Sequence, residues 1–289
     1  MQSFHDEFRL MGEAMAPIFI VAAICIVLEL KFSWRVTSGI SYRWFQGTML
    51  VLFGWLLVAL ILPGNALFFA RLAEANQFGV FATSGLPMLV MICVGVLALD
   101  LTAYLIHRAM HLSPALWRLH AVHHSDETLD ASTALRFHPI EFAITAASQA
   151  LVVYLLGLPI SAVSAYFTIA LLFNMWEHAN IRSGWVPYIV RAAVITPDLH
   201  RIHHSSDPKD HDRNFGTVLS FWDRIFGTLK TRPEHEELAF GLDKQAPCQD
   251  QSLLDLLLGP FWAQGRHDAS QGQSGSPGSS QSTKTVEFR

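Results

Sequence analysis

The chain has 289 residues, of which 15% are charged and 51% are hydrophobic, and its mean hydropathy is +0.31. A typical soluble domain contains about 25% charged residues, so this composition argues against a disordered chain and an ordinary soluble globule and predicts a membrane protein. The formal net charge of -4 excludes the basic surface that nucleic-acid-binding proteins carry. The three scattered cysteines, Cys25, Cys93 and Cys248, are too few for a disulfide framework.

Three apolar segments near the start of the chain predict membrane-spanning helices. They cover residues 14–30, 47–63 and 86–106, and their only charged side chains are Glu29 and Asp100. Each is about 17–21 residues long, which is enough to cross a hydrocarbon core of about 30 Å. The residues before the first segment are acidic rather than basic, which distinguishes it from a signal peptide.

A longer apolar segment, residues 142–176, contains no charge but exceeds the length of one span. Gly157, Leu158 and Pro159 interrupt it near the middle, because proline cannot continue the hydrogen-bond ladder of a helix and glycine weakens it. Two alternatives follow: a pair of complete spans, or a shorter hairpin that enters the bilayer and returns. Each half has about 15–17 residues, slightly short for a span, and this favours the hairpin.

Basic residues in the loops predict the orientation of these spans. They gather after the first span, after the third span and after the apolar hairpin, and are sparse in the loops between. The three basic groups are Lys31, Arg35 and Arg43; Arg108, Arg118 and Arg136; and Arg182, Arg191 and Arg201. The positive-inside rule places all three in the cytoplasm and the N-terminus outside. The number of predicted membrane crossings also places the three basic groups on the same side of the membrane, and it was counted without using the charges.

Histidine forms three motifs with helical spacing. The sequence His107-Arg-Ala-Met-His111 is an HxxxH motif, and His120-Ala-Val-His123-His124 and His200-Arg-Ile-His203-His204 are two HxxHH motifs. Residues i, i+3 and i+4 lie on one side of a helix, so each motif presents several imidazoles together. Imidazole binds iron, zinc, copper and nickel. Eight such side chains exceed one tetrahedral site, and two metal ions are therefore expected.

Other residues are candidates to join or support this site. His138 precedes the apolar hairpin and His178 follows it, which places both at the cytoplasmic end as further ligand candidates. Asp100 lies inside the third span, where an ionisable group suggests function. It is a candidate to orient a metal-bound imidazole of another helix, the alternative being a packing contact between helices. Weaker candidates of the same kind are Asp126, Glu127, Glu141 and Asp198.

The motifs and their flanking residues resemble the fatty acid hydroxylase / sterol desaturase superfamily of membrane di-iron enzymes. The resemblance rests on the three histidine motifs and on signatures around them, and covers roughly residues 90–235. The further signatures are Leu116–Ser125, Arg136-Phe137-His138-Pro139, Asn214-Phe215-Gly216 and Phe221–Thr228. These signatures identify the superfamily but do not distinguish its members.

The resemblance implies an all-α integral membrane helical bundle with a cytoplasmic, histidine-rich helical cap. It implies two iron ions, with zinc as a substitute, and O2 as co-substrate for hydroxylation or desaturation of a lipid or sterol C–H bond. The ligands that the resemblance implies are the eight motif histidines and two further histidines. They are His107, His111, His120, His123, His124, His200, His203 and His204, with His138 and His178 added. No haem-binding domain precedes the spans, so an external electron donor of ferredoxin, cytochrome b5 or reductase type is expected.

The predicted domain organisation follows these features. Residues 1–85 form N-terminal transmembrane helices, residues 86–240 the fatty acid hydroxylase-like catalytic domain, and residues 241–268 a C-terminal segment. Residues 269–289 are predicted to be a disordered tail, because 269–283 contain six Ser, three Gly and three Gln. We expect about three spans, and then a helical hairpin or a fourth and fifth span.

Two other functions remain as alternatives. A zinc site could hydrolyse a lipid in the membrane, since zinc also binds imidazole and activates water. A metal transporter would need polar residues along the spans, and apart from Asp100 these are lacking. We hypothesise that four aromatic residues line or flank a lipid-facing opening, although an interfacial aromatic belt is the stronger explanation for them. They are Trp117, Phe137, Trp176 and Trp185.

Overall fold

The computed structural model describes residues 20–36, 42–233, 237–242 and 251–262. All regular elements within these ranges are helices, and extended segments meet only in isolated β-bridges. The predicted all-α class is confirmed for this part of the chain. The predicted tail at 269–289 lies outside the described residues.

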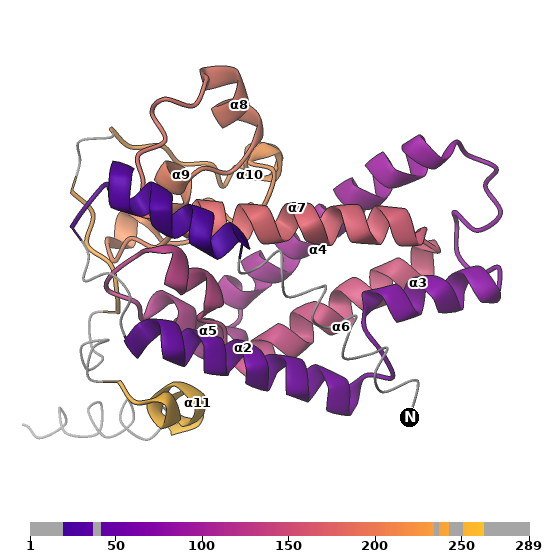
Figure 1. Cartoon of the computed structure of the whole chain (residues 1–289), viewed down its shortest axis with the longest axis horizontal. Helices are drawn as coiled ribbons and strands as arrows, with labels where there is room; N and C mark the ends of the chain where they lie inside the picture. Colours follow the sequence, from indigo (N-terminus) through magenta and orange to yellow (C-terminus); the bar gives the residue numbers. More distant parts are fainter. Residues whose placement is uncertain (1–19, 37–41, 234–236, 243–250, 263–289) are drawn as a thin grey trace, which may run out of the picture.

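Four helical segments are long and apolar enough to cross a membrane, which indicates an integral membrane protein. In Figure 1 the long helices run along the same general direction and pack side by side. The segments are Tyr42–Ala75, which contains α2 (Tyr42–Ile61) and α3 (Ala66–Ala75), then α4 (Met88–Leu112), α6 (Pro139–Leu156) and α7 (Ile160–His178). The predicted spans at 47–63 and 86–106 coincide with α2 and α4. Of the predicted span at 14–30, residues 20–30 belong to a helix that continues to residue 32, and residues 14–19 lie outside the described part.

The predicted break in the long apolar segment separates α6 from α7. Gly157 ends α6 with a left-handed backbone conformation, φ 65°, which glycine adopts without strain, and Pro159 directly precedes α7. The two helices have 18 and 19 residues, or about 27 and 28 Å at 1.5 Å per residue. Both helices are therefore longer than the sequence suggested, and each has the length of a complete span.

Small residues allow the apolar helices to approach closely. A side chain at Gly95 of α4 would lie 2.8 Å from the Cβ atom of Ala162 in α7. A side chain at Gly54 of α2 would meet the ring of Phe142 in α6 at 2.9 Å. Between the helices Leu99, Val153, Leu158, Val163 and Tyr166 form a buried apolar cluster. Small residues at the contacts and van der Waals packing are typical of helices that associate within a bilayer.

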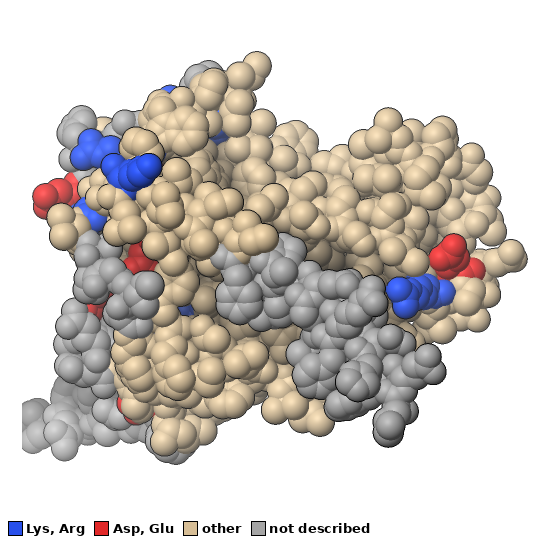
Figure 2. Space-filling model, in the orientation of Figure 1, with Lys and Arg blue, Asp and Glu red and all other residues tan. Residues whose placement is uncertain are grey.

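Charged side chains concentrate at the two ends of the bundle. Figure 2 shows Lys, Arg, Asp and Glu at these ends, whereas the described residues visible between the ends on this face carry no charge. One end carries Arg71 and Glu74, both exposed on α3. The other end contains the histidine motifs. An uncharged band between two charged ends is the expected surface of a protein embedded in lipid.

Short helices surround the histidine end, where α4 and α7 finish and α6 begins (Figure 1). They are α5 (Pro114–His124), η1 (Ala131–Leu135), α8 (Tyr188–Ala193), α9 (Pro197–His203), η2 (Pro208–Asp210), α10 (Phe221–Ile225) and α11 (Leu253–Trp262). Proline occupies the first residue of α5, α6 and α9, a position that needs no backbone donor. Two of these helices, α5 and α9, carry the HxxHH motifs and place them beside the ends of the spans.

Candidate metal centre

Nine histidines gather in two neighbouring groups, and in each group the potential ligand nitrogens lie within 4.8 Å of one another. The five-histidine group consists of His107, His111, His120, His124 and His203. The four-histidine group consists of His123, His178, His200 and His204. The groups are adjacent, because the rings of His124 and His204 stack with centroids 4.4 Å apart. The structure thus brings together all eight motif histidines and His178.

Each HxxHH motif divides its histidines between the two groups. In α5 the first and last histidines, His120 and His124, belong to the five-histidine group, and His123 belongs to the other. The motif at α9 has the opposite division, with only its middle histidine, His203, in the five-histidine group. Helix geometry explains this, since residues i and i+4 differ by about 40° around the axis but i+3 and i+4 by about 100°. Each HxxHH motif thus contributes imidazoles to both groups.

The ring nitrogens are spaced like ligands of a common ion. In the four-histidine group the Nε2 atom of His178 lies 3.1 Å from that of His123 and 2.9 Å from that of His200. The Nε2 atom of His200 is also 3.1 Å from that of His204. Two nitrogens that are each about 2.1 Å from an ion, at right angles, lie about 3.0 Å apart. The spacing therefore suits a metal ion at the centre of the group.

Backbone carbonyls orient several of these rings from behind. The Nδ1 atoms of His107, His178 and His203 donate to the carbonyl oxygens of Phe215 (2.9 Å), Asn174 (2.7 Å) and Arg213 (2.7 Å). A ring that donates from Nδ1 carries its lone pair on Nε2. The Nε2 atoms of His107, His111 and His203 are buried without a hydrogen-bond partner. Because metal-ligating histidines usually donate their other nitrogen to a carbonyl or carboxylate, the residues present fit a metal site.

Burial keeps these imidazoles in the neutral form that binds metal. Removal from water lowers the pKa of the six histidines outside the spans well below the usual value, and the neighbouring histidines lower it further. These residues are His120, His123, His124, His200, His203 and His204. A histidine with a lowered pKa is neutral at pH 7, so no proton competes with a metal ion for its lone pair.

The structure does not bring His138 to either group. Its Nδ1 atom accepts the Ile140 amide at 3.1 Å and caps the start of α6, and its Nε2 atom donates to the Leu257 carbonyl oxygen at 3.1 Å. Both nitrogens thus have protein partners. The expectation that His138 is a ligand finds no support in this geometry, because the residue connects α6 to α11 instead.

Asp100 is completely buried but contacts no histidine within the described residues. Its carboxylate accepts hydrogen bonds from the Thr217 hydroxyl (3.2 Å), the Leu219 amide (3.2 Å) and the Trp222 indole (2.8 Å). The predicted direct contact with an imidazole is therefore absent in this part of the chain. Asp100 instead ties α4 to the segment after Phe215, whose carbonyl oxygen holds His107.

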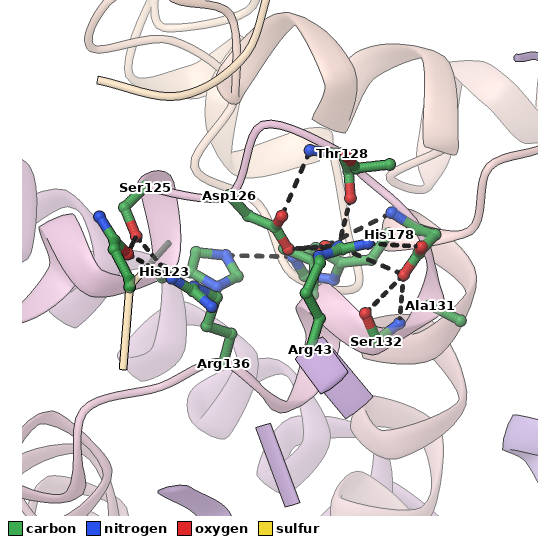
Figure 3. A network of polar contacts seen from close by, with 12 residues as sticks. Arg43, His123, Ser125, Asp126, Thr128, Ala131, Ser132, Arg136 and His178 are labelled. Atoms are coloured by element: carbon green, nitrogen blue, oxygen red, sulfur yellow. Dashed lines mark hydrogen bonds and ion pairs between the residues drawn. The ribbon is translucent and has the colours of Figure 1, made fainter. Parts of the chain in front are cut away.

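A buried ionic network supports the loop that follows the second histidine motif. Figure 3 shows the Arg43 side chain of α2 beside Asp126, with His123 and His178 nearby. Arg43 pairs with Asp126 and, at 2.9 Å, with Asp130. Burial opposes ionisation of Asp126, but the arginines outweigh it and hold the pKa of this carboxyl below its usual value. Asp126 thus fixes the loop through Arg43, and through the Thr133 hydroxyl, which donates to it at 2.7 Å.

Of the weaker sequence candidates, Glu141 contacts a histidine: its Oε1 atom lies 2.6 Å from the Nδ1 atom of His120. Asp198 instead pairs with Arg201 and accepts from Ser183, and Glu127 is exposed.

Two further carboxylates near the histidines were missed by sequence reasoning. Glu177 is buried beside His200 and His178, at 3.8 and 3.9 Å from their Nδ1 atoms. Its position next to a histidine at the end of an apolar helix was the available signal. Asp212 lies 3.6 Å from the Nδ1 atom of His111, and nothing in the sequence around it indicated that contact.

Aromatic rings cover parts of both groups. Trp117 lies against His111 and His124, with centroids 5.0 and 5.4 Å apart, and Phe137 stacks on His123 at 4.5 Å. These are two of the four aromatic residues hypothesised to surround an opening. The other two, Trp176 and Trp185, pack against each other at 5.9 Å.

The middle of the chain matches a known family. Residues 92–228 match the sequence model of the fatty acid hydroxylase family, and this range contains every histidine of the two groups. These residues form a fatty acid hydroxylase domain. The match extends from α4 to the segment after α10 and agrees with the range over which the sequence resembles the superfamily. No solved structure matches the chain.

Curated relatives include three kinds of lipid enzyme. The chain is 26% identical over 273 residues to the ornithine lipid hydroxylase OlsE of Rhizobium tropici, which covers 92% of this chain and 80% of the relative. It is 33% identical over 149 residues to the alkylglycerol monooxygenase of Danio rerio, covering 50% of this chain and 31% of the relative. Lathosterol oxidase of Mus musculus is 27% identical over 157 residues, covering 54% and 50%. The chain thus spans most of OlsE but only a third to a half of the other two.

Proposed function

We propose that this protein is a membrane-bound, non-haem di-iron oxidoreductase that uses O2 to hydroxylate or desaturate a C–H bond of a lipid or sterol. The observation that carries the proposal is the pair of buried histidine groups within a fatty acid hydroxylase domain. Two irons held there would supply the oxidising power for an unactivated C–H bond, which no amino-acid side chain provides.

The chain's own residues would hold and orient the metal ions. We assign one ion to the five-histidine group and one to the four-histidine group, because imidazole is a suitable ligand for iron and the two groups are separate but adjacent. The carbonyl oxygens behind His107, His178 and His203 would keep each lone pair directed inward. These three histidines would therefore have the proton on Nδ1 and the lone pair on Nε2 before any ion binds.

The surroundings of the groups would exclude water and admit lipid. Trp117 and Phe137 cover imidazoles with apolar rings, and Phe215 packs edge-on to His107 at 5.7 Å. The helix that carries His107 and His111 is itself a membrane-spanning candidate. Its exposed Leu105 and Leu112 place apolar surface next to these histidines. A lipid chain could thus reach the site without leaving an apolar environment.

We place the histidine end on the cytoplasmic face. The basic residues of the loops at this end support the assignment through the positive-inside rule, whereas residues 62–87 at the α3 end contain one basic residue, Arg71. A cytoplasmic site would be accessible to an external electron donor of the ferredoxin, cytochrome b5 or reductase type.

An ornithine lipid is the first substrate to test, because the relative named for that substrate aligns with 92% of this chain. Alkylglycerols and sterols follow, since the relatives named for them cover about half of it.

The alternative of a zinc-dependent lipid hydrolase has weaker support. Catalytic zinc sites commonly use three protein ligands and often include a carboxylate. Among the described residues both candidate groups contain histidines alone, and they contain five and four of them. This number suits two ions better than one hydrolytic zinc.

Metal content and product formation in the same preparation test the proposal. We expect about two irons per chain in gently extracted protein, and oxidised lipid that has gained one oxygen or lost two hydrogens. The variant His123→Ala should insert in the membrane, lose iron and show turnover that is at least about 100-fold lower. Removing a hydrogen-bond partner of a metal ligand typically lowers metal affinity or activity by about 10–100-fold, and loss of the ligand itself should have a larger effect.

The matched control is His211→Ala, which removes an exposed histidine outside both groups. This variant should keep the iron and the turnover of the wild type. Full activity of His123→Ala would contradict the ligand assignment. Zinc that persists through iron supplementation, together with lipid hydrolysis, would favour the alternative.

A further inference from the structure

Two buried glutamates lie directly behind the histidine groups. Glu141 is in the first turn of α6, and Glu177 is in the last turn of α7. Their side chains are 6% and 2% exposed. The ion-pair contacts of both carboxylates within the described residues lead only to histidines. A buried carboxylate without a cationic partner is unfavourable, so its position requires an explanation.

Glu141 supports the five-histidine group. Its Oε1 atom accepts a hydrogen bond from the Nδ1 atom of His120 at 2.6 Å. The Nε2 atom of the same ring faces His124 at 3.2 Å. The carboxylate thus fixes the tautomer in which Nε2 carries the lone pair, and negative charge at Nδ1 strengthens that lone pair as a ligand.

Glu177 occupies the corresponding position behind the four-histidine group. Its Oε2 atom lies 3.8 Å from the Nδ1 atom of His200, and both atoms are buried without a hydrogen-bond partner. The Nε2 atom of His200 points the other way, toward His178 and His204. An unpartnered donor thus faces an unpartnered acceptor, and a small rotation of either side chain would form the bond.

The two arrangements follow one pattern. His120 and His200 are each the first histidine of an HxxHH motif, and each has one glutamate behind it. We propose that Glu141 and Glu177 are positioning residues that independently set the metal affinity of the five-histidine and four-histidine groups. This inference rests on the proposed function, since it requires that both groups bind metal.

Charge balance gives the same assignment. Neutral imidazoles add no negative charge, so a divalent ion among them would remain uncompensated in a buried site. One carboxylate behind each group offsets part of that charge without occupying a coordination position. Loss of one glutamate should therefore weaken one ion and leave the other unchanged.

The test compares Glu141→Gln and Glu177→Gln with the wild type, each loaded with iron(II) in detergent. Glutamine keeps the size and removes the charge. Iron retained per chain is measured against increasing chelator, and Mössbauer spectra of 57Fe identify which iron remains. We expect each variant to lose one of two irons at about 10–100-fold lower chelator concentration. The remaining iron should give a different spectrum in the two variants, and the double variant should lose both.

Two comparisons separate this result from a general loss of structure. Glu74→Gln changes an exposed glutamate at the far end of the bundle and should retain the wild-type chelator curve. Glu141→Asp and Glu177→Asp keep the charge and should recover part of the retention. A monodisperse elution profile and an unchanged circular dichroism spectrum confirm that each variant is folded.

Wild-type chelator curves in both glutamine variants, or simultaneous loss of both irons in each, would overturn the inference. Failure of the proposed function has a different signature, which is wild-type protein that binds no iron. The same variants would then be titrated with cobalt(II), and equal cobalt affinity in the variants and the wild type would again overturn the inference.

Discussion

The two histidine groups have the same ligand type but different structural support. In the five-histidine group three rings depend on one loop, residues 212–215, which contacts His111 through Asp212 and holds His203 and His107 through two carbonyl oxygens. In the four-histidine group His178 bonds to a carbonyl of its own helix, at Asn174. One group therefore relies on a loop and the other on a membrane-spanning helix.

The two histidine groups also differ in solvent exposure, and the group that depends on the loop is the more exposed one. His107 and His111 are partly exposed residues, whereas all four members of the four-histidine group are buried. Asp212 itself has a side chain that is 55% exposed. The five-histidine group is thus closer to the protein surface, and the 212–215 loop contacts three of its rings.

Among the substitutions that should affect the two histidine groups differently, we expect Asp100→Asn to have the largest effect. The carboxylate accepts three hydrogen bonds that anchor the chain just after the 212–215 loop, and an amide cannot accept all of them. Unsatisfied buried donors should cost about 1–3 kcal/mol of stability. Iron should leave the five-histidine group first, as measured by thermal unfolding and by Mössbauer spectra. Wild-type iron retention in this variant would show that the hydrogen bonds of Asp100 do not influence metal binding.

A smaller effect is expected from Asp212→Asn. Asparagine tolerates the left-handed conformation of this residue, φ 58°, and removes only the charge that faces His111. The chelator concentration that removes iron from the five-histidine group should fall by about 10-fold, which is the lower end of the range for hydrogen-bond partners of metal ligands. The four-histidine group should show no change. Equal weakening of both groups would mean that the loop supports the site as a whole.

The smallest effect on metal binding is expected from His138→Ala. This residue caps α6 and contacts α11, and belongs to neither group. Loss of the cap should reduce stability by about 1 kcal/mol, which a shift in the thermal midpoint would detect. Iron content should remain at the wild-type value. A loss of one iron would restore His138 as a ligand and contradict the geometry.

Local spacing explains why much of this architecture could be predicted. The lengths of apolar runs located α2, α4, α6 and α7, and Gly157 with Pro159 located the turn between the last two. The i, i+3, i+4 pattern selected the eight motif histidines. These features depend on residues within one or two helical turns of each other, so they can be read from sequence without a three-dimensional arrangement.

The remaining features depend on contacts between distant segments. His107 is held by the carbonyl oxygen of a residue 108 positions later, and Asp100 by residues 117 to 122 positions later. Spacing could not show that His138 would be used as a helix cap rather than as a ligand. The division of each HxxHH motif between two groups became visible only when α5 and α9 were placed beside each other.

Support from carbonyl oxygens has a consequence for how such a protein can evolve. Three imidazoles are oriented by main-chain atoms of Asn174, Arg213 and Phe215, and every amino acid supplies a carbonyl oxygen. As far as this hydrogen bond is concerned, those positions can drift to other residues while the tautomer of the facing ring persists. Side chains next to the histidines could therefore change during evolution, and with them the preferred lipid, while the histidines keep their orientation.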